Sequence, residues 1–388
     1  MATVSEWEPI SGLSKTDSDS LELFAIENSE IMSLAVVNRK KVTKARNYVG
    51  VVGFTDNNYL EILPKIGSDE EKKRSIMMEM LSIALVGSWK SRDNTGVDRK
   101  NSILEFYIEM FIEECFRVIG VGLNSDYRAY QSNEGFVRGK ILHLENIKRN
   151  SVMKNRFFVE YELFDQDSAE NRIVKAALTK LLLVSRSNRN KKKIRSLLDH
   201  FGNVDSVTDY KTEFQKCTKD RNTTHYRLLL AWCKVFLENL GFQPIHGTNI
   251  SYVFLFPMEK LYESYVRYKL KDNLPDGWKL SSQDSSRHLF DGKKISIRPD
   301  LALYGKGHLV IMDTKWKDPN NHVSQSDLYQ MYIYSVKYHS DRTILLYPEY
   351  IDLDYTDKDN RVQISSMRFN VENPDESLTE IRDYLISL

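Results

Sequence analysis

Short apolar runs alternate with polar turns in the first part of the chain. Three of these runs are rich in β-branched and aromatic residues, which predicts strands at 31–37, 48–54 and 59–63. The last two runs are separated by Thr-Asp-Asn-Asn, a typical hairpin turn. We therefore expect a small antiparallel sheet over residues 21–66, preceded by a polar, flexible tail over residues 1–20.

Apolar residues then recur every three or four positions, the spacing of one face of a helix. This pattern predicts four helices: 70–90, 102–119, 168–186 and 223–240. The segment 102–119 is apolar on nearly every side, so we expect it to be buried. Strand-like runs at 127–144 and 156–163 separate the second helix from the third.

After residue 245, predicted strands and helices alternate over short distances. The pattern predicts strands at 252–256, 294–298, 301–304, 308–316 and 343–347, and helices at 258–271 and 325–338. Such alternation is typical of a sheet with helices packed on it. We therefore expect an α+β, β-rich N-terminal domain at 21–170. An α/β domain should follow at 171–388, with a helical lead-in at 171–245 and a core at 246–388.

Composition and motif content exclude several classes of protein. The net charge is +1, so any binding to nucleic acid depends on local patches, and the basic run 186–195 is either such a patch or a solvated loop. The three cysteines form no CxxC pair, which argues against a zinc ribbon. There is no signal-peptide pattern and no apolar run of about 18 residues, so we expect a cytoplasmic protein without a membrane span. No P-loop motif occurs, so this chain itself should bind no nucleotide.

The strongest chemical signal is a pair of carboxylates with a lysine. Asp300, in an Arg-Pro-Asp sequence, precedes two apolar strands, and the second strand leads into Asp313 and Lys315. Side chains alternate along a strand, so Asp313 and Lys315 lie on the same face. If Lys306-Gly307 forms a two-residue hairpin loop, Asp300 lies directly opposite Asp313. A shift of one residue in the loop would separate the two carboxylates.

This arrangement suits a divalent metal ion, because two neighbouring carboxylates repel each other unless a cation lies between them. Asp300 and Asp313 would hold Mg²⁺, with the main-chain carbonyl of Thr314 as a further oxygen ligand. The metal would lower the pKa of a bound water. Lys315 would orient this water and offset phosphate charge. The alternative interpretation is a purely structural ion pair between Asp313 and Lys315.

Four further residues are candidates for the same site. Glu263, on the predicted helix at 258–271, is a candidate catalytic group and metal ligand. Gln330 and Tyr334 are four residues apart on one helix face. We expect Gln330 to be a catalytic residue and Tyr334 to contact DNA. Lys317 follows the catalytic strand and is a candidate phosphate contact.

The aspartates and lysine match the PD-(D/E)xK nuclease superfamily, and the wider chain resembles the McrC family. The segments that carry the likeness occur in order over about 45–348: Tyr48-Val-Gly-Val-Val52, Leu60-Glu-Ile-Leu-Pro-Lys-Ile-Gly67, Val137-Arg-Gly-Lys-Ile141, Asn171-Arg-Ile-Val-Lys175 and Phe256-Pro-Met-Glu-Lys-Leu-Tyr-Glu263. The resemblance implies a restriction-endonuclease-like fold for the second domain. It also implies Mg²⁺ as the cofactor, with Mn²⁺ as a substitute.

The resemblance further implies partners. A McrC-like protein is the DNA endonuclease subunit of a McrBC-type, modification-dependent restriction system. It docks through its N-terminal part on a McrB-like AAA+ ring, stimulates hydrolysis of GTP or ATP by that ring, and cuts DNA. Dimerisation would allow cleavage of both strands. Two alternatives remain: a non-cleaving activator of the motor, and a PD-(D/E)xK repair nuclease that works alone.

Overall fold

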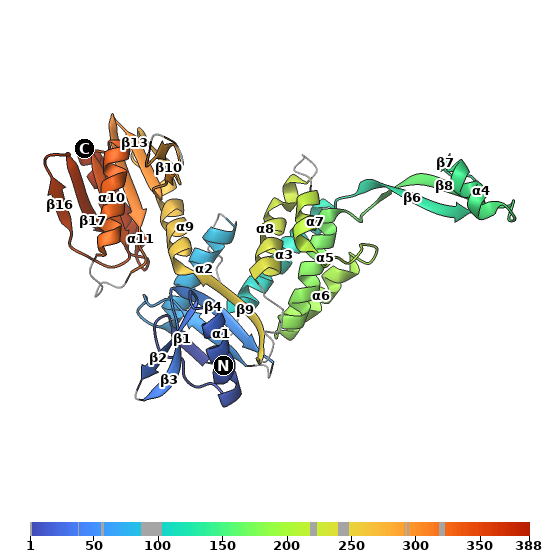
Figure 1. Ribbon diagram of the computed structural model, residues 1–388, viewed down its shortest axis with the longest axis horizontal. Helices are drawn as coiled ribbons and strands as arrows, with labels where there is room; N and C mark the ends of the chain where they lie inside the picture. The colour runs from blue at the N-terminus through green and yellow to red at the C-terminus, as the bar shows by residue number, and fades with distance from the viewer. Residues whose placement is uncertain are drawn as a thin grey trace. The chain divides into compact units, whose positions relative to one another are not determined.

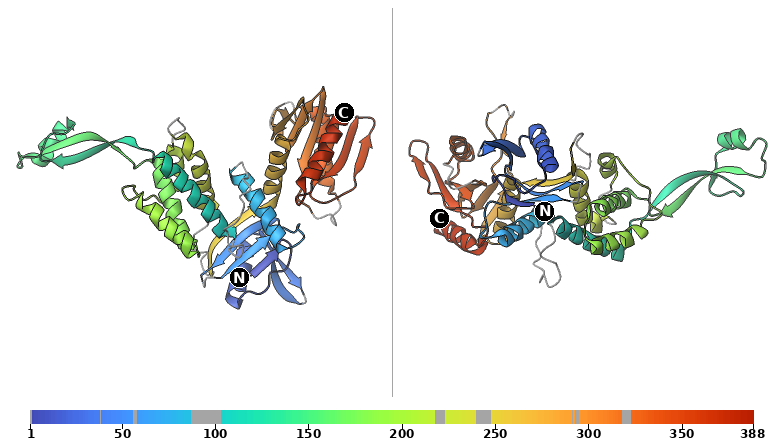
Figure 2. Two further views of the ribbon diagram at one scale, coloured as in Figure 1. Left: turned by 180° about the vertical axis from the view of Figure 1, so that it is seen from behind. Right: turned by 90° about the horizontal axis from the view of Figure 1, so that it is seen from below.

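The computed structural model describes residues 2–37, 39–55, 58–86, 103–217, 223–239, 248–290, 292, 295–317 and 323–388. They form two compact units, whose elements are drawn in Figures 1 and 2. The first unit consists of Met1–Gly96 and Phe242–Leu388, and the second of Val97–Gly241. The chain thus leaves the first unit and returns to it, a division that differs from the predicted domains at 21–170 and 171–388.

A four-stranded sheet forms the N-terminal part of the first unit. Its strands are, in spatial order, β1 (Ala2–Ser5), β5 (Tyr59–Leu63), β4 (Tyr48–Phe54) and β9 (Ile250–Pro257). β1 runs parallel to β5, whereas the other neighbours are antiparallel. The predicted strands at 48–54 and 59–63 are confirmed. The first unit contains two separate segments of the chain because β9, in the second segment, pairs with β4 in the first.

A helix and a hairpin pack on this sheet: α1 (Lys15–Glu27), β2 (Met32–Val37) and β3 (Lys40–Ala45). Ser14 caps α1, because its side chain accepts a hydrogen bond from the main-chain N–H of Asp17 at 3.2 Å. Leu21 and Phe24 are buried in the core that α1 shares with the sheet. β1 and the start of α1 therefore occupy the segment predicted to be a flexible tail. The polar residues of this segment include Ser14, which caps α1, so their presence does not indicate a flexible chain.

A six-stranded sheet forms the C-terminal part of the same unit. Its strands are, in spatial order, β10 (Trp278–Ser282), β13 (Leu301–Gly305), β14 (His308–Thr314), β15 (Arg342–Tyr347), β17 (Val362–Arg368) and β16 (Asp354–Asp357). β14, β15 and β17 are parallel, and the outer neighbours are antiparallel. A separate small pair consists of β11 (Arg287–His288) and β12 (Ser296–Ile297).

Three helices accompany this sheet: α9 (Met258–Lys271), α10 (Gln325–Tyr338) and α11 (Pro374–Ser387). Another helix, α2 (Glu70–Val86), contacts β5 of the four-stranded sheet. α10 covers one face of the sheet and α11 the opposite face (Figures 1 and 2). α2 packs against α9, which connects the N-terminal part of the unit to the six-stranded sheet. The helices predicted at 258–271 and 325–338 are confirmed. The sequence pattern did not predict β16, β17 or α11. The two strands add an edge to the sheet, and α11 is a further helix that packs on it.

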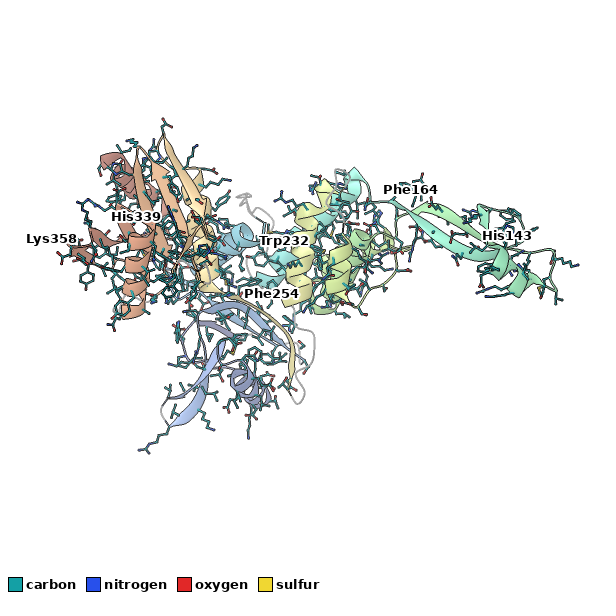
Figure 3. All side chains as sticks on the ribbon, turned by 45° about the horizontal axis from the view of Figure 1, so that its top comes forward. His143, Phe164, Trp232, Phe254, His339 and Lys358 are labelled. Atoms are coloured by element: carbon teal, nitrogen blue, oxygen red, sulfur yellow. The ribbon has the colours of Figure 1, made fainter. Side chains whose placement is uncertain are left out.

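The second unit is built on helices: α3 (Ile103–Val121), α5 (Ala169–Val184), α6 (Asn188–Asp199), α7 (Tyr210–Lys216), the 3₁₀ helix η1 (Thr224–Tyr226) and α8 (Arg227–Asn239). Its buried core contains Trp232, which is labelled in Figure 3. The Trp232 ring stacks on Phe236, with ring centroids 5.6 Å apart. Much of the basic run 186–195 belongs to α6, and its Lys193 pairs with Glu109 of α3 at 3.2 Å. Among the described helices, α3 included, none is long and apolar enough to cross a membrane.

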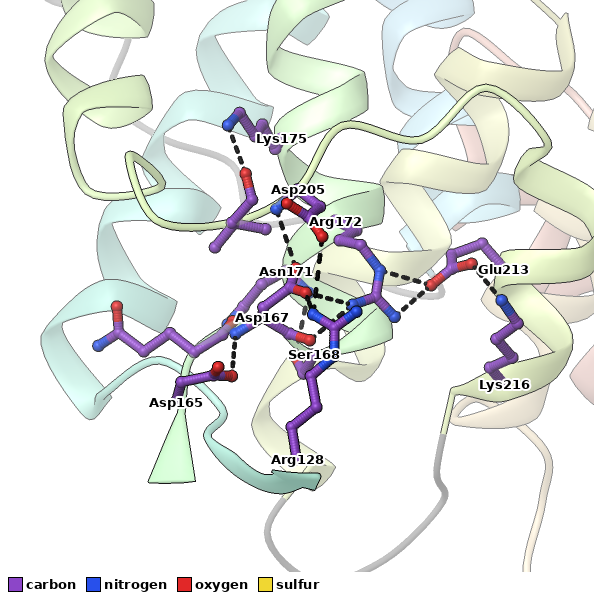
Figure 4. A network of polar contacts seen from close by, with 12 residues as sticks. Arg128, Asp165, Asp167, Ser168, Asn171, Arg172, Lys175, Asp205, Glu213 and Lys216 are labelled. Carbon is purple, nitrogen blue, oxygen red and sulfur yellow. Dashed lines mark hydrogen bonds and ion pairs between the residues drawn. The ribbon is translucent and has the colours of Figure 1, made fainter. Parts of the chain in front are cut away.

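A long antiparallel arm belongs to the second unit: β6 (Asp126–Glu134), β7 (Lys140–Ile141), α4 (His143–Asn150) and β8 (Phe157–Asp165). Figure 4 shows the ion pairs at the base of the arm. Asp167 pairs with Arg172 at 3.0 Å and with Arg128 of β6. Arg172 also pairs with Glu213 of α7 at 2.6 Å. These ion pairs tie the arm to α5 and α7.

Candidate active site

The hairpin of β13 and β14 determines where the two predicted aspartates lie. Gly305 pairs with His308, and the ladder continues outward to Leu301 and Met312. Lys306 and Gly307 have φ values of 50° and 88°, as a two-residue hairpin turn with left-handed backbone requires. The predicted two-residue loop is therefore confirmed. Asp300 directly precedes Leu301 and Asp313 directly follows Met312, so the two aspartates come together at the same end of the hairpin.

Asp300 is held at the end of this hairpin by Thr314. Its Oδ2 accepts hydrogen bonds from the main-chain N–H of Thr314 at 2.8 Å and from the Thr314 hydroxyl at 2.7 Å. The other oxygen, Oδ1, lies 3.5 Å from the side-chain amide of Gln283. Two short hydrogen bonds thus hold Oδ2, whereas Oδ1 has only the longer contact with Gln283.

Asp313 is buried, with 2% of its surface exposed, and pairs with Lys315. Burial and the negative charge of Asp300 together raise the pKa of the Asp313 carboxyl to about 6, although the charge of Lys315 lowers it. The two aspartates are therefore close enough to repel each other. A cation that binds between them would relieve this repulsion.

Lys315 is held in place by a second contact, because its Nζ donates a hydrogen bond to Oε1 of Gln330 at 3.0 Å. Burial lowers the pKa of the Lys315 ammonium, but the nearby carboxylates of Asp313, Asp327 and Asp300 outweigh burial and raise it. The ammonium group is therefore charged at neutral pH. A charged lysine can orient a water molecule or stabilise a phosphate, but it cannot accept a proton.

Gln330 and Tyr334 meet on α10 as predicted. The Gln330 amide donates to the Tyr334 hydroxyl at 2.8 Å, and this hydroxyl donates to the main-chain carbonyl of Arg298 at 3.0 Å. Tyr334 is only 4% exposed. Its burial favours support of Gln330 and of the segment before Asp300 over the predicted contact with DNA.

Lys317 lies beyond the end of β14 and contacts the start of α10. Its Nζ pairs with Asp327 and donates to Oγ of Ser324 at 3.2 Å, the residue that caps the helix. The contact ties α10 to the chain just after Lys315. A phosphate would have to compete with Asp327 for this ammonium.

Glu263 approaches the site from α9 through Gln283, a residue that the sequence pattern did not mark. The amide of Gln283 donates to Oε1 of Glu263 at 2.5 Å and lies near Asp300. Burial raises the pKa of Glu263, and the charge of Asp300 raises it further. Gln283 follows directly after β10 in a left-handed conformation, with φ 53°. Only the pairing of β10 with β13 brings it to the site.

Within the described ranges, no group of three or more His, Cys, Asp or Glu side chains is arranged to hold a metal ion. The oxygen groups that are present nevertheless suit a hard divalent cation in their chemistry. Asp313 and Glu263 both have pKa values raised in part by the charge of Asp300. Positive charge at this position would therefore be stabilised by all three carboxylates.

The fold and the site define a mixed α/β protein with two aspartates and a half-buried lysine at the ends of neighbouring strands. A family model described as McrBC 5-methylcytosine restriction system component matches residues 43–348. The chain belongs to this family, and the resemblance to McrC is confirmed.

Two solved structures from Thermococcus gammatolerans are similar in fold. One is a refined half-complex from the tetradecameric assembly of McrB AAA+ hexamers with bound McrC. It is 19% identical, with a TM-score of 0.69, and the match covers 98% of this chain and 100% of that chain. The other is a McrBC complex that is 22% identical, with a TM-score of 0.54, over 71% of this chain and 88% of that chain. No curated protein matches the sequence.

Proposed function

We propose that the chain is the Mg²⁺-dependent DNA endonuclease subunit of a McrBC-type restriction system, with a PD-(D/E)xK site, and that it acts in the cytoplasm. The observation that carries this proposal is the confirmed hairpin register. It brings Asp300 and Asp313 to the same end of the hairpin, where Lys315 pairs with Asp313. The family supports the same conclusion, since it is named for a restriction system.

Asp300, Asp313 and Glu263, with the main-chain carbonyl of Thr314, would hold Mg²⁺ or Mn²⁺. When bound, the cation supplies Lewis acidity toward the phosphate and lowers the pKa of a water molecule. Lys315, held by Gln330, would orient the attacking water and offset charge on the phosphate. Lys317 would contact a neighbouring phosphate.

The partner is proposed to be a McrB-like AAA+ ring that hydrolyses GTP or ATP. The similar solved structures contain McrB AAA+ hexamers with bound McrC. The part of this chain proposed to dock, residues 21–170, includes the arm, which exposes many apolar side chains. Large exposed apolar patches often mark interaction surfaces, so the exposed apolar side chains of the arm are candidates for such a surface. They are Tyr127, Phe136, Val137, Leu144, Ile147, Val152, Met153 and Phe164.

The first test is cleavage of plasmid DNA in the presence of Mg²⁺. The wild type and Asp313→Ala are compared, each alone and with the neighbouring AAA+ protein plus GTP or ATP. We expect the wild type to cut only with motor and nucleotide, and Asp313→Ala to lose at least about 10²-fold in rate, the loss typical of removing one charge-stabilising group. Asp352→Asn, at an exposed position, is the matched control and should cut normally.

Two other outcomes would replace the proposal. A wild type that never cleaves DNA but still stimulates nucleotide hydrolysis would be a non-cleaving activator. Efficient cleavage by the chain alone would identify a free-standing repair nuclease. A double-strand break that depends on protein concentration would support the expected dimerisation.

A further inference from the structure

A second buried carboxylate lies close to the catalytic strand but outside the site described above. Glu6 follows β1 and is 1% exposed. Its Oε1 accepts hydrogen bonds from the indole Nε1 of Trp316 at 2.6 Å and from the main-chain N–H of Lys65 at 3.1 Å. Its Oε2 is buried and has no hydrogen-bond partner among the described residues.

The position of Glu6 is costly for a carboxylate. Burial raises the pKa of Glu6 to about 7, although the charge of Lys65 and both hydrogen bonds act in the opposite direction. An apolar side chain would fill the same space at lower cost. Glu6 therefore contributes to the structure through the hydrogen bonds that it accepts. Among these, the bond from the indole of Trp316 is the one that comes from a side chain.

Trp316 connects this carboxylate to two parts of the active site. It directly follows Lys315 in the chain and is 1% exposed. Its ring lies 5.4 Å from the ring of Tyr262, measured between centroids. Tyr262 belongs to α9 and directly precedes Glu263. The indole thus packs where the chain after β14 meets the helix that carries the third carboxylate.

We propose that Glu6 is a positioning residue of the active site. By holding the indole of Trp316, it fixes the segment that carries Lys315 against the helix that carries Glu263. The strand before Glu6, β1, pairs with β5, so Glu6 links the N-terminal sheet to the segment that carries Lys315. The catalytic part of this inference rests on the proposed function.

The first experiment measures amide hydrogen exchange of the peptide covering residues 313–317 in the full chain without metal. Glu6→Ala removes the acceptor and leaves the buried indole N–H unpaired, so we expect exchange there to become about 10-fold faster. Glu6→Gln keeps an acceptor oxygen and should exchange like the wild type. Ile62→Val, a buried change in the same sheet away from Trp316, is the control for general loss of stability. Equal exchange in Glu6→Ala and Ile62→Val would overturn the proposal.

The second experiment measures the Mg²⁺ concentration that gives half-maximal DNA cleavage with the motor present, well below the melting temperature. We expect Glu6→Ala to raise this concentration about 10-fold, the usual effect of losing a group that orients a metal site. Glu6→Gln should restore the wild-type value. An unchanged Mg²⁺ requirement in folded Glu6→Ala would refute the catalytic role. If the wild type does not cleave DNA, the proposed function fails, whereas hydrogen exchange still decides whether Glu6 positions this segment.

Discussion

Burial and charge repulsion both act on the carboxylates of the site at the scale of single residues. Burial, followed by the charge of Asp300, raises the pKa of both Asp313 and Glu263. Two groups oppose this repulsion. Lys315 pairs with Asp313, and the amide of Gln283 lies between Glu263 and Asp300. A divalent cation would oppose it more strongly, so the site should gain stability when metal binds.

Gln283→Glu tests this view by replacing the amide donor with another carboxylate. We expect the free energy of unfolding in EDTA to fall by about 1–3 kcal/mol, the cost of an uncompensated polar group. Added Mg²⁺ should restore most of the loss, because the cation offsets the added charge. Thermal unfolding with and without Mg²⁺ measures both effects.

The matched control is Gln131→Glu on the arm, where the amide contacts Glu160 at 2.6 Å on an exposed surface. This variant also places two carboxylates together, but solvent screens them, so its melting temperature should not respond to Mg²⁺ more than that of the wild type. A loss of stability in Gln283→Glu that Mg²⁺ leaves unchanged would argue against a cation at this position.

The hairpin of β13 and β14 is the element on which the site depends, because its two-residue turn sets the register of the aspartates. Gly307 adopts φ 88° and has no atom near its missing Cβ, so the backbone conformation and not space limits substitution. Asparagine tolerates this conformation, whereas a β-branched residue does not. The turn therefore offers a way to change register without touching a catalytic side chain.

Gly307→Val should destabilise the fold by about 1–3 kcal/mol, the usual cost of a strained backbone. It should also reduce cleavage strongly, because the turn must relax to accept valine and a shift by one residue moves Asp300 away from Asp313. Gly307→Asn should keep both stability and cleavage. Urea unfolding and the plasmid assay measure the two effects, and wild-type cleavage by a folded Gly307→Val would disprove the link between this turn and the site.

At the scale of the whole molecule, the proposed activities belong to different parts of the chain. The carboxylates and Lys315 lie on the six-stranded sheet, whereas the exposed apolar side chains of the arm lie in the second unit. Cleavage and stimulation of the motor should therefore be separable. Each unit has its own buried core, so a substitution in one need not disturb the fold of the other.

Asp300→Ala should abolish DNA cleavage and leave stimulation of the motor's nucleotide hydrolysis unchanged. Removing Asp300 takes away one proposed metal ligand but touches no residue of the arm. Steady-state hydrolysis by the AAA+ protein, with and without the variant, measures the second activity. Loss of both activities in a folded Asp300→Ala protein would contradict the division of labour.

The sequence by itself determined the features that depend on neighbouring residues. Helical periodicity predicted α9 and α10 at the bounds that the structure has, and the Gly-Lys-Gly turn predicted the register of Asp300 and Asp313. These predictions succeed because hydrogen bonds within a helix or across a tight turn join residues close in the chain.

Only the tertiary structure decided which distant segments meet. The return of β9 to β4, the place of Gln283 between two carboxylates and the bond from Glu6 to Trp316 all join residues far apart in sequence. Periodicity and turn chemistry report a local environment, so they do not specify such partners. The physical reason is that long-range pairing is selected by packing of the whole core, which no single segment encodes.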